Sequence, residues 1–323
     1  MKKLAVVCGG NSGEKVISLK SSEFVIQSLN PNKYQGYQVI IEDKAWNYIA
    51  PDGTSYPIDK NDFSVKLDGV HIKFDVVFNI IHGDPGENGK LQAYFEMLGI
   101  PNTSSDSTVS ALTFNKAYCN HIVRDLGVNV AASVHLFKSN TIDVEAILNK
   151  VGIPCFVKPN SGGSSIGMSR VNTEEDLVPA IEKAFAVDNE ILIEEFFEGR
   201  ELTCGVMQTQ GQMVVFPICE VVSKKEFFDY EAKYNDDLVD ELIPAPIDNS
   251  VAEVIKANAV FLYKRLHLSG VARIDFIFNN DEYIFLEVNT IPGLSAQSIV
   301  PNMARAYGWS DSELIDRIID EAF

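Results

Sequence analysis

The sequence predicts an α/β fold for the first third of the chain and an α+β fold for the rest. In the first third, short apolar runs alternate with amphipathic stretches, a pattern typical of strands and helices that follow one another. Beyond residue 101, strand-like runs succeed one another without a helix between each pair. Because 323 residues exceed what one hydrophobic core usually organises, we expect two or three domains.

The first hundred residues contain two predicted strand–helix pairs. In chain order these are strand 3–10, helix 14–29, a strand that runs into a Gly-rich turn over 74–89, and helix 89–101. Each strand-like run leads into glycines, and Gly99 and Pro101 end the second helix. The pattern predicts an open parallel sheet with functional loops at the ends of its strands.

The remaining residues are predicted to form mainly strands. The predicted elements are helix 113–127, strands 133–137, 154–159, 167–171, 190–197, 201–207 and 213–221, and helix 251–266. Between the last strand and the last helix, residues 222–241 are polar and aromatic with no clear period, which is typical of a functional loop.

Composition and charge exclude several classes of partner. A formal net charge of -18 repels polyanions, so we expect no nucleic acid and no anionic lipid surface as a partner. No run of 18 apolar residues occurs, and the first apolar stretch is too short for a signal peptide. We therefore expect a cytoplasmic protein without a membrane partner, whose five cysteines are reduced and buried.

A run of small residues follows Lys158 and is suited to holding phosphate. Its glycines and serines allow close approach to backbone N–H groups, and the lysine adds a charge. Neither a Walker A motif nor GxGxxG is present. Two alternatives are an exposed flexible turn and, over Gly163–Gly167, the nucleophile elbow of a hydrolase. The elbow needs a helix directly after it and a downstream histidine, for which only His267 is available.

Two neighbouring strands near the C-terminus carry a set of side chains suited to Mg²⁺ and a nucleotide. Period-2 alternation places Arg273 and Asp275 on one face of the first strand, and Glu287 and Asn289 on one face of the second. Oxygen ligands beside a guanidinium are what phosphoryl transfer requires. The alternative is a solvated sheet face with a cross-strand salt bridge. The Pro-Gly turn that follows can present N–H donors to an oxyanion.

The metal site sets the register of this hairpin. If Asp275 faces Glu287, paired residue numbers sum to 562, which predicts an odd turn whose shortest form is residues 280–282. An even turn would send one set of ligands to the opposite face, unless a β-bulge restored the phase.

Six motifs, in this order, make the chain resemble the D-alanine:D-alanine ligase family of the ATP-grasp superfamily. They occupy residues 9–21, 82–92, 157–169, 192–203, 227–234 and 273–301. The resemblance implies an ATP-grasp fold in which an N-terminal Rossmann-like substrate domain, residues 1–100, accompanies two α+β domains that clasp ATP. These are a central subdomain, residues 101–190, with the phosphate loop, and a C-terminal subdomain, residues 191–323, with the metal site and the mobile loop 222–241. One departure is the sequence of residues 160–163, which is more charged in much of the family.

The resemblance also implies an activity. One D-alanine carboxylate would attack the γ-phosphate of ATP to give an acyl phosphate, and the amine of a second D-alanine would displace phosphate. The products would be D-alanyl-D-alanine for peptidoglycan, ADP and phosphate. Alternatives are a depsipeptide or D-alanyl-D-serine ligase, another carboxylate-amine ligase, or a non-catalytic ATP-binding regulator. We expect ATP and D-alanine as small-molecule partners, and a homodimer.

Individual roles follow from the resemblance. ATP would contact Lys116, Lys158, Gly163, Ser164, Ser165, Glu194, Glu195, Phe197, Glu201 and Lys233. Asp275, Glu287 and Asn289 would hold two Mg²⁺ ions, for which Mn²⁺ can substitute. The catalytic set would be Glu14, His82, Ser164, Tyr234, Arg273, Gly293 and Ser298. In that set Glu14 would receive the ammonium of the first D-alanine and Ser298 the carboxylate of the second. His82 would lie near the substrate carboxylates, while Arg273 and the Gly293 N–H would hold the oxyanion. For three of these residues the alternative is a side chain without a role in the reaction. These are an exposed histidine at 82, a helix-start carboxylate at Glu14 and a surface aromatic at Tyr234.

Overall fold

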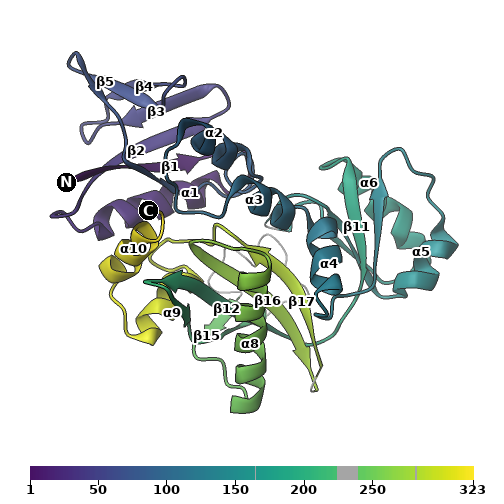
Figure 1. The fold of residues 1–323 in the computed structure, drawn as a ribbon. Helices are drawn as coiled ribbons and strands as arrows, with labels where there is room; N and C mark the ends of the chain where they lie inside the picture. Colours follow the sequence, from purple (N-terminus) through teal and green to yellow (C-terminus); the bar gives the residue numbers. More distant parts are fainter. Residues whose placement is uncertain (164, 224–238, 281) are drawn as a thin grey trace.

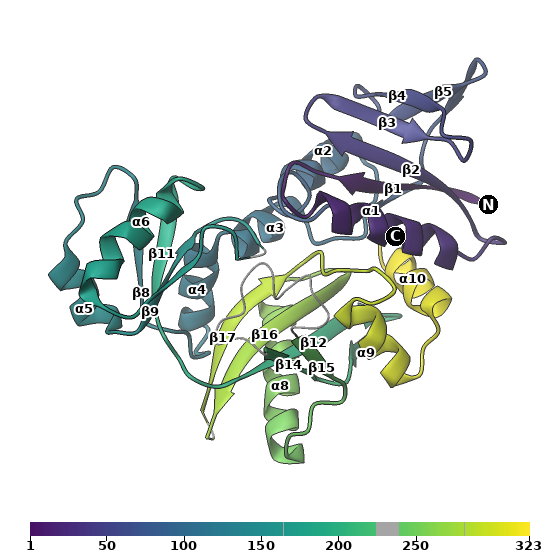
Figure 2. The same cartoon turned by 180° about the vertical axis from the view of Figure 1, so that it is seen from behind.

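The computed structural model describes residues 1–163, 165–223, 239–280 and 282–323, and arranges them around three β-sheets (Figure 1). The strand orders are β6-β5-β4-β3-β2-β1-β7 in the first sheet and β10-β9-β11-β8 in the second. The third sheet has the order β15-β14-β12-β16-β17, with β13 paired to β12. The second sheet and its helices lie at one side of the molecule in both views (Figures 1 and 2).

The first sheet combines the predicted parallel strands with an unpredicted extension. Strand β1 (Lys2–Gly9) pairs in parallel with β2 (Tyr34–Glu42) and with β7 (Val76–Asn79), and helix α1 (Lys15–Ser28) connects β1 to β2. Four antiparallel strands then extend the sheet, so it is mixed rather than purely parallel. They are β3 (Ala45–Ile49), β4 (Ser55–Asp59), β5 (Ser64–Leu67) and β6 (Val70–Ile72).

Strand β1 is buried on both faces, as a continuous apolar run predicts. Leu4 and Val6 enter one core cluster, whereas Ala5 and Val7 enter another on the opposite face. Helix α2 (Lys90–Leu98) ends as predicted at Gly99, whose φ of +66° is the left-handed conformation that glycine adopts without strain.

The helix predicted over 113–127 is two helices. They are α3 (Ser107–Phe114) and α4 (Lys116–Asp125). Between them Asn115 is extended (φ −84°, ψ 101°), and its side chain accepts the N–H of Tyr118 at 3.0 Å, which caps α4. Both helices contact β17, and α4 contributes Cys119 and Val123 to the core of the third sheet.

The second sheet has its own core. Its strands are β8 (Ser133–Phe137), β9 (Cys155–Pro159), β10 (Ser169–Val171) and β11 (Glu190–Glu195). Two helices that the sequence analysis did not predict, α5 (Val144–Val151) and α6 (Leu177–Phe185), pack against Val157, Ile191 and Ile193. A short 3-10 turn, η1 (Glu174–Asp176), precedes α6.

The third sheet is antiparallel throughout its described pairs and is covered by α8 (Asn249–Arg265). Its strands are β12 (Arg200–Thr209), β13 (Gln212–Val215), β14 (Cys219–Ser223), β15 (Val239–Leu242), β16 (Val271–Asn279) and β17 (Glu282–Asn289). The predicted loop 222–241 therefore begins and ends within strands. Its residues Lys233 and Tyr234 lie outside the described residues, as does Ser164.

The β16–β17 hairpin reaches the predicted pairing by a different route. Asn279 pairs with Glu282, so the turn has two residues and the predicted three-residue turn is wrong. A register shift after Asp275 leaves Leu286 as an extra residue on β17, and Asp275 then pairs with Glu287. The bulge thus restores the phase that an even turn would have lost.

Helices α9 (Ile299–Tyr307) and α10 (Asp311–Asp320) return the chain to the first sheet. Buried residues of α10, including Leu314 and Ile318, share a core cluster with β1 and α1. The two chain ends lie close together (Figures 1 and 2), with Lys2 Nζ 3.0 Å from the centroid of the Phe323 ring.

The five cysteines are free and buried, as predicted. Burial raises the pKa of Cys8 and of Cys204 to about 12, so these thiols stay protonated at neutral pH. None of the helices in the described ranges is long and apolar enough to cross a membrane.

Candidate active site

Two lysines expected to bind phosphate come from different elements. Lys158 on β9 is only 8% exposed, and its Nζ lies 2.5 Å from Glu194 Oε2 on the neighbouring strand β11. The other oxygen of Glu194 accepts from Asn120 Nδ2 at 2.8 Å. Lys116 begins α4, donates from Nζ to the Gly162 carbonyl at 2.6 Å, and lies 4.0 Å from Glu287 Oε2. Lys116 therefore links the glycine-rich loop to the third sheet.

The glycine-rich loop approaches the start of α1 closely. A Cβ atom placed on Gly163 would lie 2.9 Å from Glu14 Oε2, so the glycine leaves room for this carboxylate. Gly162 has φ +124° and Ser165 has φ +56°, conformations typical of a tight loop. The chain then enters β10 rather than a helix, which excludes the nucleophile elbow.

A buried polar cluster occupies β16, β17 and β12. Asp275 is 2% exposed and accepts from Arg273 Nε at 3.0 Å, from Arg273 Nη2 at 2.8 Å and from Asn289 Nδ2 at 3.0 Å. Thr203 on β12 also donates to Asp275, a contact that sequence reasoning missed. Directly opposite Asp275 lies Glu287, so the structure brings the predicted set together on one sheet face.

The charge of Arg273 is fixed by its neighbours. Burial alone would lower its pKa, but the carboxylate of Asp275, and to a lesser extent that of Glu287, outweigh burial and raise it. The guanidinium is therefore cationic at any pH at which the protein is folded.

The donor set fits a hard divalent cation through its oxygens. Within the described residues, no group of three or more His, Cys, Asp or Glu side chains is placed to hold a metal. A site here would therefore combine the carboxylates of Asp275 and Glu287 with the amide oxygen of Asn289, ligands that Mg²⁺ accepts. The Asn289 amide donates its Nδ2 to Asp275, which holds this side chain beside the carboxylate.

His82 is buried, so the exposed-bystander alternative is wrong. It is 6% exposed, and its Nδ1 lies 2.9 Å from the carbonyl of Ile291. Burial lowers its pKa despite the nearby carboxylate of Glu14. Because a carbonyl can only accept, Nδ1 carries the proton of the neutral ring. Nε2, which is buried and has no hydrogen-bond partner within the described part of the chain, is left as an acceptor.

Glu87 is a neighbour of this histidine that sequence reasoning missed. Its carboxyl group accepts the N–H of Gly83 at 2.7 Å. Burial raises its pKa to about 8, and the nearby carboxylates of Glu14 and Glu287 add to the shift. The residue lies in the glycine-rich turn 82–92, so the sequence marked the segment but gave this side chain no role.

The segment from Gly293 to Ser298 follows Ile291, whose carbonyl contacts His82. Ser298 Oγ accepts the N–H of Ser295 at 3.0 Å and lies 2.8 Å from Ser295 Oγ. A Cβ atom on Gly293 would come within 3.0 Å of Ser298 Oγ, so glycine keeps the segment tightly folded. Helix α9 begins directly after Ser298.

The other predicted nucleotide residues lie beside Lys158 and Asp275. Glu195 ends β11 and Phe197 follows it, both partly buried, and Glu201 on β12 shares a face with Thr203. Sequence reasoning missed an aromatic platform here: the Arg170 guanidinium stacks 4.5 Å from the Phe196 ring, which meets Phe156 at 5.8 Å.

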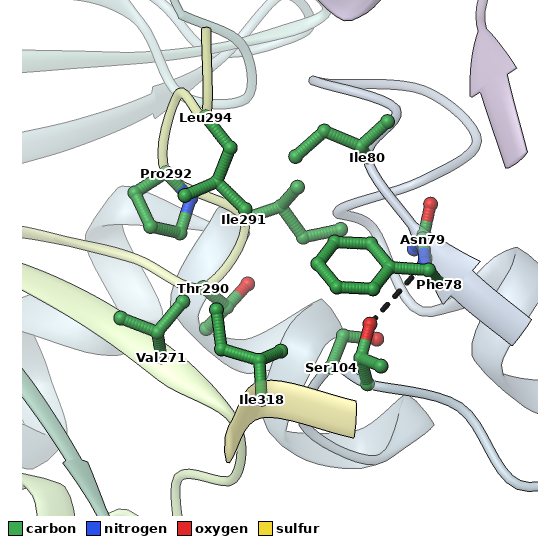
Figure 3. A pocket seen from close by; sticks show the side chains of 11 residues that line it. Phe78, Asn79, Ile80, Ser104, Val271, Thr290, Ile291, Pro292, Leu294 and Ile318 are labelled. Carbon is green, nitrogen blue, oxygen red and sulfur yellow. Dashed lines mark hydrogen bonds between the residues drawn. The ribbon is translucent and has the colours of Figure 1, made fainter. Parts of the chain in front are cut away.

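A small pocket lies behind the segment from Thr290 to Leu294 (Figure 3). Phe78, Ile80 and Ile318 point into it from the first sheet and from α10, opposite Ile291 and Pro292. Its lining within the described chain has no titratable side chain, so this pocket does not carry the chemistry.

Two family models together match most of the chain. The model described as D-ala D-ala ligase N-terminus matches residues 3–105, and that described as D-ala D-ala ligase C-terminus matches residues 122–320. The D-alanine–D-alanine ligase of Parabacteroides distasonis is 46% identical to the chain over 321 residues, 99% of this chain and 97% of the relative.

Solved structures of ligases share the fold over its full length. The VanG D-Ala:D-Ser ligase from Enterococcus faecalis is 33% identical with a TM-score of 0.87, covering 100% of this chain and 99% of its own. The D-alanine–D-alanine ligase from Bacillus anthracis complexed with ATP is 27% identical with a TM-score of 0.79, covering 100% of this chain and 97% of its own.

Proposed function

The chain belongs to the D-alanine–D-alanine ligase family, and from this premise we propose how its described residues carry out the reaction of that family. The enzyme has the ATP-grasp fold and joins two D-alanine molecules into D-alanyl-D-alanine for peptidoglycan, using ATP. A single arrangement supports the site assignment most strongly: Asp275 and Glu287 lie opposite each other beside Arg273, and Lys116 reaches Glu287 from α4.

We propose that ATP lies between the second and third sheets. Lys158 and Lys116 would bind its phosphates, and the loop around Gly163 and Ser165 would cover them together with Ser164. The base would contact Glu194, Glu195 and Phe197, and Glu201 would bind the ribose. Lys233 would complete this set from the loop 222–241.

Two metal ions are part of the proposal. Asp275, Glu287 and Asn289 would hold Mg²⁺ or Mn²⁺, which would supply positive charge to the phosphate oxygens when bound. The cationic Arg273 already compensates Asp275 in the absence of metal. We expect Asp275→Asn to bind Mn²⁺ more weakly than wild type. Electron paramagnetic resonance measures this binding directly, so the result does not depend on turnover.

The substrate half of the site would be built from the first sheet and the segment before α9. Glu14 would receive the ammonium of the first D-alanine, and Ser298 the carboxylate of the second. The buried His82 would face the substrate carboxylates, and Arg273 with the Gly293 N–H would stabilise the oxyanion of the tetrahedral intermediate. Tyr234 would close over the site. No protein nucleophile is required, so positioning and charge supply the rate.

The organisation of the chain is also proposed. It would divide into three domains near the expected bounds 1–100, 101–190 and 191–323, with the whole of β11 in the central domain because it pairs with β8 and β9. The protein would act in the cytoplasm and form a homodimer.

The activity is tested with purified protein, ATP, Mg²⁺ and D-alanine. We expect stoichiometric ADP and D-alanyl-D-alanine, and little product with D-lactate at neutral pH. Because one structural relative is a D-Ala:D-Ser ligase, D-serine must be assayed as a competing acceptor. ADP release without a dipeptide, or dipeptide formation only with D-serine, would contradict the proposal.

A further inference from the structure

Asn160 lies at the end of β9, two residues beyond Lys158, and is fully buried at 0% exposure. All four of its hydrogen-bonding groups are used. Its N–H donates to the Glu190 carbonyl at 2.9 Å, and its carbonyl accepts the N–H of Lys116 at 3.1 Å. Its side-chain Oδ1 accepts the N–H of Ala117 at 2.9 Å, and its Nδ2 donates to Glu190 Oε2 at 3.0 Å.

These bonds join two elements that each carry a phosphate-binding lysine. The N–H groups of Lys116 and Ala117 open α4, where a helix lacks internal partners, and Asn160 accepts both of them. Asn160 also continues directly from Pro159 and Lys158 on β9. The residue is therefore a rigid link between the main chain at Lys116 and the main chain at Lys158.

Glu190, the first residue of β11, holds this link from behind. Its Oε2 accepts from Asn160 Nδ2 at 3.0 Å and lies 3.0 Å from His135 Nε2 and 3.5 Å from Asn115 Nδ2. Asp188 Oδ2 accepts the N–H of Ser161 at 2.8 Å, where the phosphate loop begins. The loop and the start of α4 are thus fastened to the same edge of the second sheet.

We propose that Asn160 is a positioning residue for ATP, which sets Lys116 against Lys158 and the phosphate loop through its bond to Glu190. This inference rests on the proposed function, because it takes the two lysines to be phosphate ligands. Asn160 does not reach a substrate itself. It acts by fixing where the Lys116 side chain starts, and Lys116 already reaches the loop carbonyl of Gly162. Its effect should therefore fall on ATP and not on D-alanine.

The test compares four variants with wild type. Asn160→Ala removes both side-chain bonds. Asn160→Asp keeps the acceptor for Ala117 but sets a carboxylate oxygen against Glu190. In Asn160→Asp/Glu190→Gln the amide now at position 190 can donate to the carboxylate now at position 160. The hydrogen bond is thus restored with donor and acceptor exchanged. The matched control is Asp143→Ala, which removes the cap of α5 in the same part of the fold, where Asp143 accepts the N–H of Ala146 at 3.0 Å.

We expect Asn160→Ala and Asn160→Asp to raise the KM for ATP about tenfold, or about 1.4 kcal/mol, while the KM for D-alanine changes less than about twofold. ADP affinity, measured by calorimetry, should fall in parallel. The double variant should recover most of the ATP affinity. Asp143→Ala should lower Tm to a similar extent but leave the KM for ATP within about twofold of wild type.

Three outcomes would overturn the inference: an unchanged KM for ATP in Asn160→Asp, no recovery in the double variant, or equal effects on ATP and D-alanine. If Asn160→Ala does not fold, Asn160→Asp and the double variant Asn160→Asp/Glu190→Gln still test the inference. Calorimetric ADP binding also separates this inference from the proposed function. A wild-type protein that bound ADP but made no dipeptide would contradict the function, while the ADP affinities of the variants would still decide the role of Asn160.

Discussion

Lys158 and Glu194 form an ion pair that is almost removed from water, with side-chain exposures of 10% and 8%. The sequence placed both residues near a nucleotide but gave no sign that they contact each other, since 35 residues of chain separate them. A lysine at the end of an apolar strand would on that basis be removable without harm to folding. The pairing changes this expectation, because a buried carboxylate without its cation is strongly unfavourable.

Lys158→Ala should therefore lower the free energy of unfolding of the ligand-free protein by about 3 to 5 kcal/mol, as well as abolish ATP use. The double variant Lys158→Met/Glu194→Gln removes both charges and should recover most of that stability, since Asn120 can still donate to the new amide. It should not recover ATP use. Urea unfolding measures the stability of each variant, and calorimetry measures its affinity for ADP. Full stability in Lys158→Ala would show that the ion pair contributes nothing to folding.

Glu87 gives the ligand-free protein a pH dependence of known sign. Its pKa rises from 4.5 to about 8 on folding, so between these values the folded state holds a proton that the unfolded chain releases. The contribution is complete below about pH 4.5 and is lost as pH rises through about 8. The slope is at most about 1.4 kcal/mol per pH unit.

The measurement is the difference in unfolding free energy between wild type and Glu87→Gln, in EDTA, from pH 5 to 8. Wild type should lose stability relative to the variant across this range. The comparison with Glu87→Gln is needed because His82 also affects the pH dependence of stability. Its pKa is lowered from 6.5, so below that pH it makes the stability rise with pH. Parallel curves for the two proteins would mean that Glu87 titrates in its ordinary range.

The β16–β17 hairpin separates what alternation can predict from what it cannot. The sequence correctly paired Asp275 with Glu287, because the expected metal site requires these two carboxylates to face each other. Alternation with period two gave only which residues share a face within each strand. It gave the wrong turn length, because a two-residue turn plus one bulged residue satisfies the same constraint as a three-residue turn. Only coordinates distinguish the two, and Leu286 has no special residue type to mark it as the bulge.

One alanine inserted between Glu287 and Val288 should destroy the Asn289 contact. The insertion keeps Asp275 opposite Glu287 but moves Asn289 to the other face of β17, because a one-residue slip reverses each later side chain. Mn²⁺ affinity in the presence of ADP should fall at least about tenfold if Asn289 is a ligand. That factor is about 1.4 kcal/mol, in the range of one charge-assisted contact.

Deletion of Leu286 is the matched control. The residues on either side of it already pair with Phe276 and Asp275, so deletion leaves a regular ladder with the same ligands facing each other. We expect this variant to keep Mn²⁺–ADP affinity within about threefold of wild type, or about 0.7 kcal/mol. Equal losses in both variants would mean that register does not control the metal site.

Other features of the fold were not predicted because they also lack a local signal in the sequence. Strands β3 to β6 are short and mostly half-exposed, so they lack the apolar runs that marked β1 and β7. The break between α3 and α4 depends on Asn115, whose side chain substitutes for the helix bond that the extended backbone gives up. The contacts of Lys116 with Gly162 and Glu287 join residues far apart in the sequence, so no local sequence pattern predicts them.

The distribution of core residues suggests how the protein opens. Among the residues that the structure describes, those in the core of the second sheet all lie between Val134 and Ile193. The core beneath β1 instead combines α1, β12, β14, α9 and α10, so the first and third sheets share buried surface. The second sheet can therefore open without exposing the core that the other two sheets share.

Native-state hydrogen exchange should show this difference. Amides of Ile191 and Ile193 should exchange through an opening of lower free energy than those of Val6 and Met207. ADP with Mg²⁺ should raise protection in the second sheet most, because the proposed nucleotide site uses Lys158 of the folded second sheet. Identical opening free energies throughout would instead indicate a single cooperative unit.

The core that joins β1 to α10 also has a consequence for synthesis. Leu4 and Val6 leave the ribosome long before Leu314 and Ile318, which cover the same face. One side of β1 must therefore stay incompletely covered while the residues between them are made. Contacts between residues so far apart in sequence form slowly, and the uncovered apolar face is open to aggregation in that interval. Strand β1 is thus completed only when α10, made much later, has left the ribosome.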